Sequence, residues 1–352
     1  MAICGPSSTD PRMPSLSTPT VLTVLLACAS LTACGDPSGS VQGTPQLDIT
    51  LDLLKDRSAY AQLNKAGVEA LALQAQTKWP AELDNFELRS VEKFSAGGES
   101  HWLSIWSHHK TELEFVLVPG GRFQMGSPSE EWSRKGIEQQ NWVELDPFLV
   151  SRTECTQAAW SAVAASAQLN TSPSKFHGSS DLPVETVSPE EADRWCQAAG
   201  LSLPTEAQWE YACRAGTTTT WSMSGDKSDL SGCANLGSLE SPQERIDLGL
   251  FESWSDGYGH LTSKVGTFKP NAFGLFDVHG NVSEWVRDGL SDYLEQPTDR
   301  LGLRPGQPAN RVYRGGNFGS NANGARSAFR WRSDPDDSSE YMGLRPSLDL
   351  PL

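Results

Sequence analysis

Cysteine is missing from the C-terminal third of this sequence, because Cys233 is the last of seven cysteines in 352 residues. This absence excludes thiolate nucleophiles, and thiolate ligands of soft metal ions, from every later position. Histidine is also scarce, and the spacing of the six residues matches no His-x3-His-x-Glu metal-binding set. The adjacent His108 and His109 would point to opposite faces of a strand, which suits a ligand pair poorly, and both are expected to be exposed.

Basic residues are few, with 28 Lys and Arg against 44 Asp and Glu, a formal net charge of -16 and a pI of about 4.8. Nucleic-acid binding needs clustered basic residues, and the sequence has no such cluster, so nucleic acid is excluded as a partner. An acidic surface suits multivalent cations and an extracytoplasmic setting, and it is also compatible with other classes of protein. With 31 Gly, 22 Pro and 12 Trp, the composition favours a loop-rich fold held by aromatic residues.

Long hydrophobic runs are also lacking, since the apolar stretch at 21–31 is too short for a stable membrane span. It precedes Leu31-Thr32-Ala33-Cys34, which resembles a bacterial lipobox. We therefore expect a lipoprotein signal peptide at 1–33, with Cys34 acylated and anchoring the chain to the cell envelope. Glycine after Cys34 favours the outer membrane. An ordinary cleaved signal or a buried helix stays open, as does a start at Met1 or Met13, because only Arg12 precedes the run.

Export would change the meaning of the remaining cysteines, because disulfides form in oxidising compartments. Cys4 and Cys28 would be removed with the signal, and Cys34 would carry lipid. Four cysteines would then remain for up to two disulfides, with three pairings open: Cys155, Cys196, Cys213 and Cys233.

The rest of the chain divides by pattern into three parts. A Gly/Ser/Pro tether is expected at 34–45, a helical extension at 46–100, and one larger domain at 101–352. Within the larger domain, capping signals and helical spacing predict helices at 157–164, 189–199 and 206–215, the last ending at Gly216. Short alternating runs predict strands, and the segment after 217 is rich in Gly, Asn and Asp. Helices and strands without regular alternation indicate an α+β fold.

Six segments of the larger domain occur in the order of one known family. The string LPTEAQWEYA at 203–212 and the string NAFGLFDVHGNVSEW at 271–285 resemble the sulfatase-modifying-factor, or formylglycine-generating-enzyme, family. The other matching segments are at 115–127, 153–160, 314–318 and 343–346. The resemblance implies the irregular, loop-rich fold of that family, which has short antiparallel strands and a few helices and is distantly similar to C-type lectins.

Two oxygen-rich segments suggest sites for a hard cation. Asp277 and Glu284 flank a Gly-Asn turn, and Asn235 and Asp256 form a second oxygen-rich set. Both sets combine carboxylates with carbonyl oxygens, which suits calcium. On the residues alone, ordinary turn roles for these Asp and Asn residues stay open. The resemblance implies two structural calcium ions. The first would use Asn235, the Leu236 carbonyl, Asp256 and the Tyr258 carbonyl; the second would use Asp277, the Gly280 carbonyl, the Val282 carbonyl and Glu284.

The catalytic chemistry of that family is not expected here. Its members oxidise a substrate cysteine with oxygen and copper(I) held by two thiolates, which the resemblance places between 314 and 343. Ser320 stands where the first thiolate would fall, and no cysteine follows, so neither bound copper nor formylglycine synthesis is expected. No Gly-x-Ser-x-Gly elbow supports a serine hydrolase either.

The same segment supplies amide and guanidinium groups for binding. Asn317, Ser320, Arg326 and Arg330 are candidates to line a groove for a peptide, carbohydrate or protein ligand. The alternative is that the arginines are internal partners of acidic residues. The sequence thus predicts an envelope-anchored domain that binds a ligand or partner, and an enzyme with non-cysteine catalytic residues is the alternative. It does not name the ligand or the oligomeric state.

Overall fold

The computed structural model describes residues 49–240, 243–247, 251–291, 300–302 and 310–350. The predicted signal peptide, Cys34 and the tether therefore lie outside the described residues. Within the described ranges, no helix combines the length and the apolar character needed to cross a bilayer. Residues 48–352 cluster as one compact unit, which includes both the segment expected as an extension and the larger domain.

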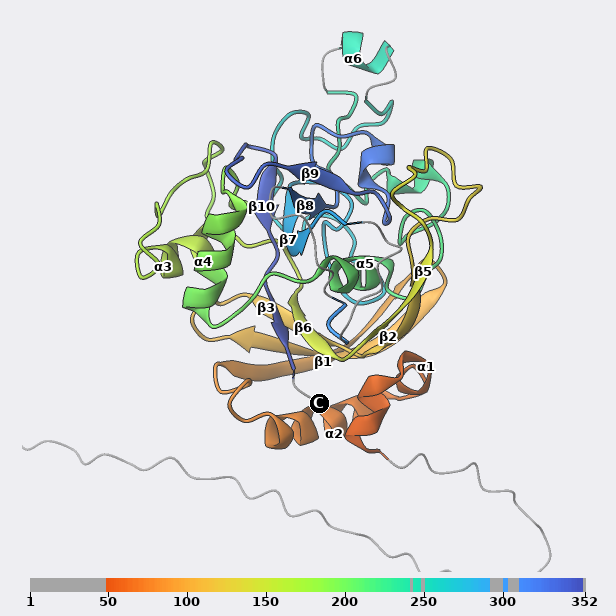
Figure 1. Cartoon of the computed structure of the whole chain (residues 1–352), viewed down its shortest axis with the longest axis vertical. Helices are drawn as coiled ribbons and strands as arrows, with labels where there is room; N and C mark the ends of the chain where they lie inside the picture. The colour runs from red at the N-terminus through yellow and green to blue at the C-terminus, as the bar shows by residue number, and fades with distance from the viewer. Residues whose placement is uncertain (1–48, 241–242, 248–250, 292–299, 303–309, 351–352) are drawn as a thin grey trace, which may run out of the picture. The chain divides into compact units, whose positions relative to one another are not determined.

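The main sheet has five strands in the order β1-β2-β3-β6-β11, and every neighbouring pair is antiparallel (Figure 1). The strands are β1 Phe86–Ala96, β2 Glu99–His108, β3 Glu114–Val118, β6 Phe148–Ser151 and β11 Ser347–Asp349. The central strands β3 and β6 are buried over nearly their whole length, as their continuous apolar sequences require. The edge strand β1 alternates buried and exposed residues and carries charges on its open side, which opposes pairing with other chains.

The N-terminal helices belong to this sheet rather than to a separate extension. They are η1 Leu51–Lys55, α1 Arg57–Tyr60 and α2 Lys65–Lys78. The Asn64 side chain caps α2 by accepting from Gly67 N at 3.0 Å, and the helix buries Val68, Leu71 and Ala75 against β1 and β2. Within the expected helical extension, the last helix ends at Lys78 and β1 begins at Phe86. Residues from Phe86 alternate in the strand period, because one face of β1 covers the core.

Histidine burial also departs from the expectation. His108, the last residue of β2, is 1% exposed, packs against Phe86 and Phe115, and bonds Thr111 Oγ1 through Nδ1 at 2.9 Å. His109 is exposed, as expected. β2 ends at His108 and is buried over its last six residues, whereas His109 lies in the turn that follows and reaches solvent.

A second, smaller sheet and a hairpin complete the strands. The sheet order is β10-β7-β8-β9, with β10 parallel to β7 and the other pairs antiparallel, and β4 pairs with β5 in the hairpin. The strands are β4 Gly121–Met125, β5 Asn141–Leu145, β7 Ser283–Gly289, β8 Arg311–Arg314, β9 Trp331–Ser333 and β10 Met342–Leu344. The strands are thus short and largely antiparallel, as the sequence predicted, with β10 as the exception.

The three predicted helices form where their capping signals place them. They are α3 Gln157–Ala164, α4 Pro189–Ala199 and α5 Glu206–Arg214, and the Thr156, Ser188 and Thr205 side chains accept from backbone amides at their N-termini. Both predicted capping boxes are present, at α4 and α5. The α5 helix ends one residue earlier than expected, because Ala215 takes the left-handed conformation expected of Gly216.

The remaining helical pieces are short, and loops dominate between α5 and β7. The pieces are η2 Lys227–Leu230, α6 Gln243–Asp247 and η3 Ala322–Ala325. These loops bring 235–238, 256–259 and 277–284 together through backbone and side-chain bonds. The mixture of a few helices, short strands and long loops confirms the predicted α+β class.

Candidate functional site

The segment expected to carry catalysis forms a tight turn at Ser320. Ser320 N donates to Asn317 O at 2.8 Å, and Asn317 N donates to Ser320 Oγ at 3.2 Å. The Asn317 amide group donates to Ser283 Oγ at 3.0 Å, so both predicted groove residues are half-buried and held by the turn. Among the described residues, no histidine or carboxylate hydrogen-bonds Ser320 Oγ. The hydroxyl therefore has no general base to activate it.

The two candidate groove arginines are internal. Arg326 is fully buried, and its guanidinium contacts Glu131 at 2.6 Å and Glu138 at 2.9 Å. Arg330 forms a fork with both oxygens of Glu206, at 2.6 and 2.7 Å. Buried guanidinium groups must be paired to offset lost hydration, and this acidic chain supplies the carboxylates. Arg326 and Arg330 are thus buried partners of acidic residues, the alternative that the sequence left open.

The first predicted calcium segment is assembled around a buried amide. Asp256 accepts from Leu236 N at 3.0 Å, from Ser238 Oγ at 2.9 Å and from Tyr258 N at 2.9 Å, so its carboxylate draws the two loops together. Asn235 is 1% exposed and donates from Nδ2 to Leu261 O at 3.0 Å, which orients its carbonyl oxygen. That oxygen, Oδ1, is buried without a hydrogen-bond partner.

The second predicted segment also contains a buried oxygen without a hydrogen-bond partner. Asp277 is buried and accepts from Gly266 N through Oδ2 at 2.7 Å, while Oδ1 has no partner. Burial raises the pKa of Asp277 above its ordinary value. Glu284 is paired with the Arg345 guanidinium at 2.7 Å and accepts from Trp209 Nε1 at 2.6 Å. Since buried oxygens are rarely left unpaired, an orphan in each predicted segment is an observation that a bound cation would explain.

A third carboxylate, which the sequence did not predict, lies beside the second calcium segment. Glu154 is fully buried, accepts from Val282 N at 3.3 Å, and receives the Asn281 amide at 3.3 Å. Burial, and next the Asp277 carboxylate, raise the pKa of Glu154 well above its ordinary value. Glu154 adjoins a helix and a cysteine in sequence, so no local signal marked it.

The excess negative charge of the second segment suits a hard cation, but side chains alone do not supply a complete set of ligands. Glu154, Asp277 and Glu284 share one guanidinium, that of Arg345, so their carboxylates outnumber the cations near them. In the described ranges, no three His, Cys, Asp or Glu side chains converge as a ready metal cluster. Any ion here would rely on carbonyl and amide oxygens as well, which is the mixture calcium takes.

Asn281 joins the two segments. Its Oδ1 accepts from Asn235 Nδ2 at 3.2 Å and from Ser263 N at 2.9 Å, and its backbone N–H donates to Asn235 O at 2.8 Å. Asn281 has a φ of +63°, which brings its side chain and amide to the same side of the turn. The sequence did not predict this junction, because Asn235 and Asn281 are 46 residues apart and meet only in the fold.

The four cysteines that remain after the predicted signal are free thiols in this structure, so neither of the two disulfides that the sequence allows is shown. Cys213 is buried, and its sulfur faces His279 Nε2 at 3.9 Å and Ser327 Oγ at 3.8 Å instead of another sulfur. Cys155 and Cys196 are also buried, whereas Cys233 is half-buried. Burial raises the pKa of each of the four thiols, which disfavours the thiolate form.

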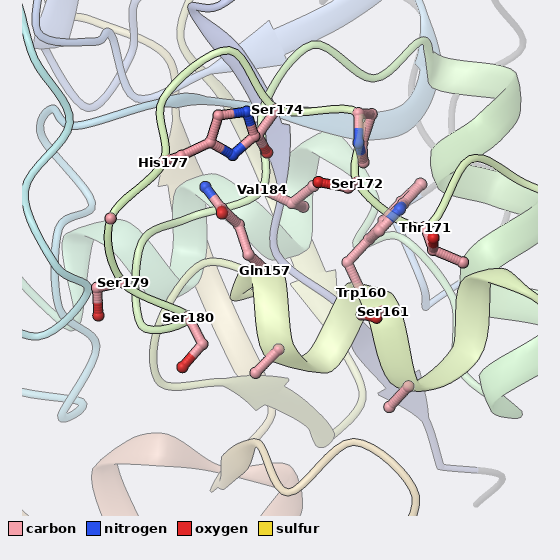
Figure 2. Close-up of a pocket in the computed structure, with 14 residues that line it drawn as sticks. Gln157, Trp160, Ser161, Thr171, Ser172, Ser174, His177, Ser179, Ser180 and Val184 are labelled. Carbon is pink, nitrogen blue, oxygen red and sulfur yellow. The ribbon is translucent and has the colours of Figure 1, made fainter.

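A pocket of about 700 Å³ lies on α3, on a different part of the fold (Figure 2). Gln157 and Ser161 of α3 form one wall, and the loop that contains Ser172, Ser174 and His177 forms the opposite wall. Its volume lies within the range of small-molecule sites, which is roughly 300–1,000 Å³. No sequence motif marks this pocket, because its walls come from a helix and a loop that carry none.

Known proteins resemble this chain over most of its length. The family model described as the sulfatase-modifying factor enzyme 1-like domain matches residues 105–349. A formylglycine-generating enzyme of Streptomyces coelicolor is 30% identical over 67% of this chain and 90% of its own length. The inactive C-alpha-formylglycine-generating enzyme 2 of Bos taurus is 27% identical, over 69% of this chain and 90% of its own.

A solved structure agrees with the sequence matches. PvdO from Pseudomonas aeruginosa superimposes with a TM-score of 0.59 at 27% identity, covering 70% of this chain and 98% of its own. The matched range runs from the middle of β2 through β11, and it contains the Ser320 turn and both oxygen-rich segments. On these matches, the chain belongs to the sulfatase-modifying factor enzyme 1-like (formylglycine-generating-enzyme) family.

Proposed function

We propose that this chain is an envelope-anchored member of the family that binds a ligand or partner and does not make formylglycine. One observation carries the proposal: no cysteine follows Cys233, and Ser320 stands where the resemblance places the first copper-binding thiolate. A neutral hydroxyl does not replace a thiolate as a copper(I) ligand. The Bos taurus relative, whose name includes the word inactive, is a precedent for this fold without the activity.

The surviving cysteines offer no substitute. Cys155, Cys196 and Cys213 are buried, and their raised pKa keeps them as thiols at neutral pH. A hydrolase role for Ser320 has no support, because no histidine or carboxylate of the described residues hydrogen-bonds its hydroxyl. These two points support binding over a rearranged catalytic site.

Two further parts of the proposal concern the anchor and calcium. Cys34 would carry lipid and hold the domain on the extracytoplasmic side of the envelope, the outer membrane being favoured. Calcium would occupy the two oxygen-rich segments and would cross-link their loops. The orphaned Asn235 Oδ1 and Asp277 Oδ1 support this part. Metabolic labelling with a radioactive fatty acid tests the anchor, since Cys34→Ala should lose the label and release the protein.

The catalytic part is tested with a Cys-x-Pro-x-Arg peptide, copper(I) and oxygen. Mass spectrometry of the peptide should show unchanged cysteine with this protein and the aldehyde with the Streptomyces coelicolor relative as positive control. Ser320→Ala should behave as the wild type does. Aldehyde formed by the wild-type protein above the level of a protein-free reaction would overturn the proposal.

A further inference from the structure

The pocket on α3 has an unusual lining for so acidic a protein. Charged residues make up 20% of the chain, yet none of the 14 lining residues is Asp, Glu, Lys or Arg. Hydroxyl groups predominate instead, with one amide and one imidazole. The polar lining residues are Gln157, Ser161, Thr171, Ser172, Ser174, His177, Ser179 and Ser180. A charged ligand would find no counter-charge in this lining, and burying an unpaired charge is costly.

The Gln157 amide is held so that one acceptor is left for a ligand. Its Nε2 donates to Phe176 O at 2.8 Å and to Pro183 O at 3.2 Å, which fixes which end of the amide is nitrogen. No protein group bonds Gln157 Oε1 in the described structure. Figure 2 shows this amide extending from α3 toward the His177 ring, which also has no hydrogen-bond partner among the described residues.

The loop wall is fixed before any ligand arrives. The carboxylate of Glu185, which is fully buried, accepts from Lys175 N at 3.1 Å and from Phe176 N at 2.9 Å, and Ser174 Oγ accepts from Glu185 N at 3.2 Å. Behind α3, Trp160 Nε1 donates to Asn170 O at 2.7 Å. A wall held in this way loses little conformational entropy when it binds.

The main-chain groups at the pocket rim disfavour a peptide as the ligand. Gln157 N donates to Leu182 O at 2.9 Å, and Ala158 N donates to Ser180 O at 3.1 Å, so these amides are not free to pair with an extended strand. Sugar hydroxyls, in contrast, both donate and accept, as do the hydroxyl, amide and imidazole groups of this lining.

We propose that this pocket, bounded by α3 and the 171–180 loop, is a binding site for a neutral oligosaccharide. Gln157 Oε1 accepts from a sugar hydroxyl, and His177 with the serine and threonine hydroxyls contacts neighbouring hydroxyls. This inference rests on the binding role proposed above and names the ligand class of that role. It places the site at α3 and not at the Ser320 turn.

Saturation-transfer NMR and calorimetry on the full chain test the site. The probes are maltotriose, cellotriose and triacetylchitotriose, with trigalacturonic acid and a neutral tetrapeptide as comparison ligands. At least one neutral sugar should bind saturably, and Gln157→Ala should raise its Kd roughly fivefold, the effect of one typical hydrogen bond. His177→Ala should weaken binding as well, whereas His109→Ala, at an exposed position outside the pocket, should not.

Unfolding midpoints establish that each variant is folded before binding is compared. Binding unchanged by both pocket substitutions, binding confined to the acidic sugar or the peptide, or no binding of any neutral probe would each overturn the assignment. This outcome is distinguishable from failure of the proposed function, because aldehyde formation on the cysteine peptide is measured independently of sugar binding.

Discussion

At the scale of single residues, Arg326 shows how the acidic composition is used inside the fold. Its guanidinium is fully buried between Glu131 and Glu138, and Glu138 is itself fully buried. Arg326→Met would leave the Glu138 charge without its partner. We expect a loss of about 3–5 kcal/mol in the free energy of unfolding, measured by urea denaturation.

Two comparison variants separate this effect from a general loss of charge. Lys264→Met removes an ion pair with Asp181 in which both side chains are more than half exposed, and should cost less than about 1 kcal/mol. Adding Glu138→Gln to Arg326→Met should recover part of the loss. A cost for Arg326→Met no larger than that for Lys264→Met would contradict the internal role.

His108 gives a residue-scale prediction about pH. Burial, and next the neighbouring His109 charge, lower the pKa of His108 to about 4. Because the folded pKa lies below the unfolded value of about 6.5, the folded state resists protonation, and this stability is present above pH 6.5 and lost as the pH falls toward 4. A pKa lowered to about 4 makes this contribution roughly 1–3 kcal/mol.

Urea midpoints measured from pH 7 to pH 4 check the sign. His108→Phe removes the titrating ring and should flatten the decline, whatever it costs at pH 7. His177→Gln, at an exposed loop position, should keep the wild-type slope. The same slope in His108→Phe as in wild type would show that His108 does not contribute.

At the scale of elements, Gly280 decides whether the two oxygen-rich loops can touch. A Cβ at Gly280 would lie 2.2 Å from the Asn235 carbonyl oxygen, a backbone atom that cannot move alone. Gly280→Ala should therefore force the loops apart and cost about 2–4 kcal/mol in urea denaturation. Gly136→Ala is the matched control, because a Cβ there meets nothing within 4 Å. Similar costs for the two variants would mean that the close approach is unimportant.

The elements also show how far local sequence signals reach. The Ser188 and Thr205 capping boxes depend on residues three positions apart, and α4 and α5 begin where these boxes predict. Inside the expected 46–100 extension, the β1 strand from Phe86 had no such signal, because an alternating, charged edge strand gives a weaker local pattern than a capped helix. The sequence favoured Gly216 as the C-cap of α5. The fold instead holds Ala215 in the left-handed conformation, although alanine has a Cβ.

At the scale of the whole molecule, calcium is expected to support the loop-rich region. Elemental analysis of the purified protein should find at least one calcium ion, and EGTA should lower Tm by about 5–10 °C, given about 2.7 kcal/mol of stabilisation at 100-fold excess over Kd. Asp277→Asn should reduce both effects, whereas Asp84→Asn, on an exposed turn, should not. Absence of bound calcium together with an unchanged Tm in EGTA would remove the metal from the proposal.

What the sequence by itself determined is whatever depends on residue identity or on short spacings. The family motifs at 203–212 and 271–285, the three capped helices and the absence of cysteine after Cys233 all belong here. The last point excludes thiolate ligands from residues 234–352 whatever the fold, because these residues contain no cysteine.

Only the tertiary structure decided which polar groups face inward. Arg326 was a candidate ligand-binding group until its partner Glu138, 188 residues away, was seen to bury it. The proximity of Glu154 to the Asp277 segment, and the two walls of the α3 pocket, likewise depend on residues that meet only in the folded chain. Burial of a charge or a hydroxyl depends on partners that are distant in sequence, so its role is set when the chain packs and not by its neighbours.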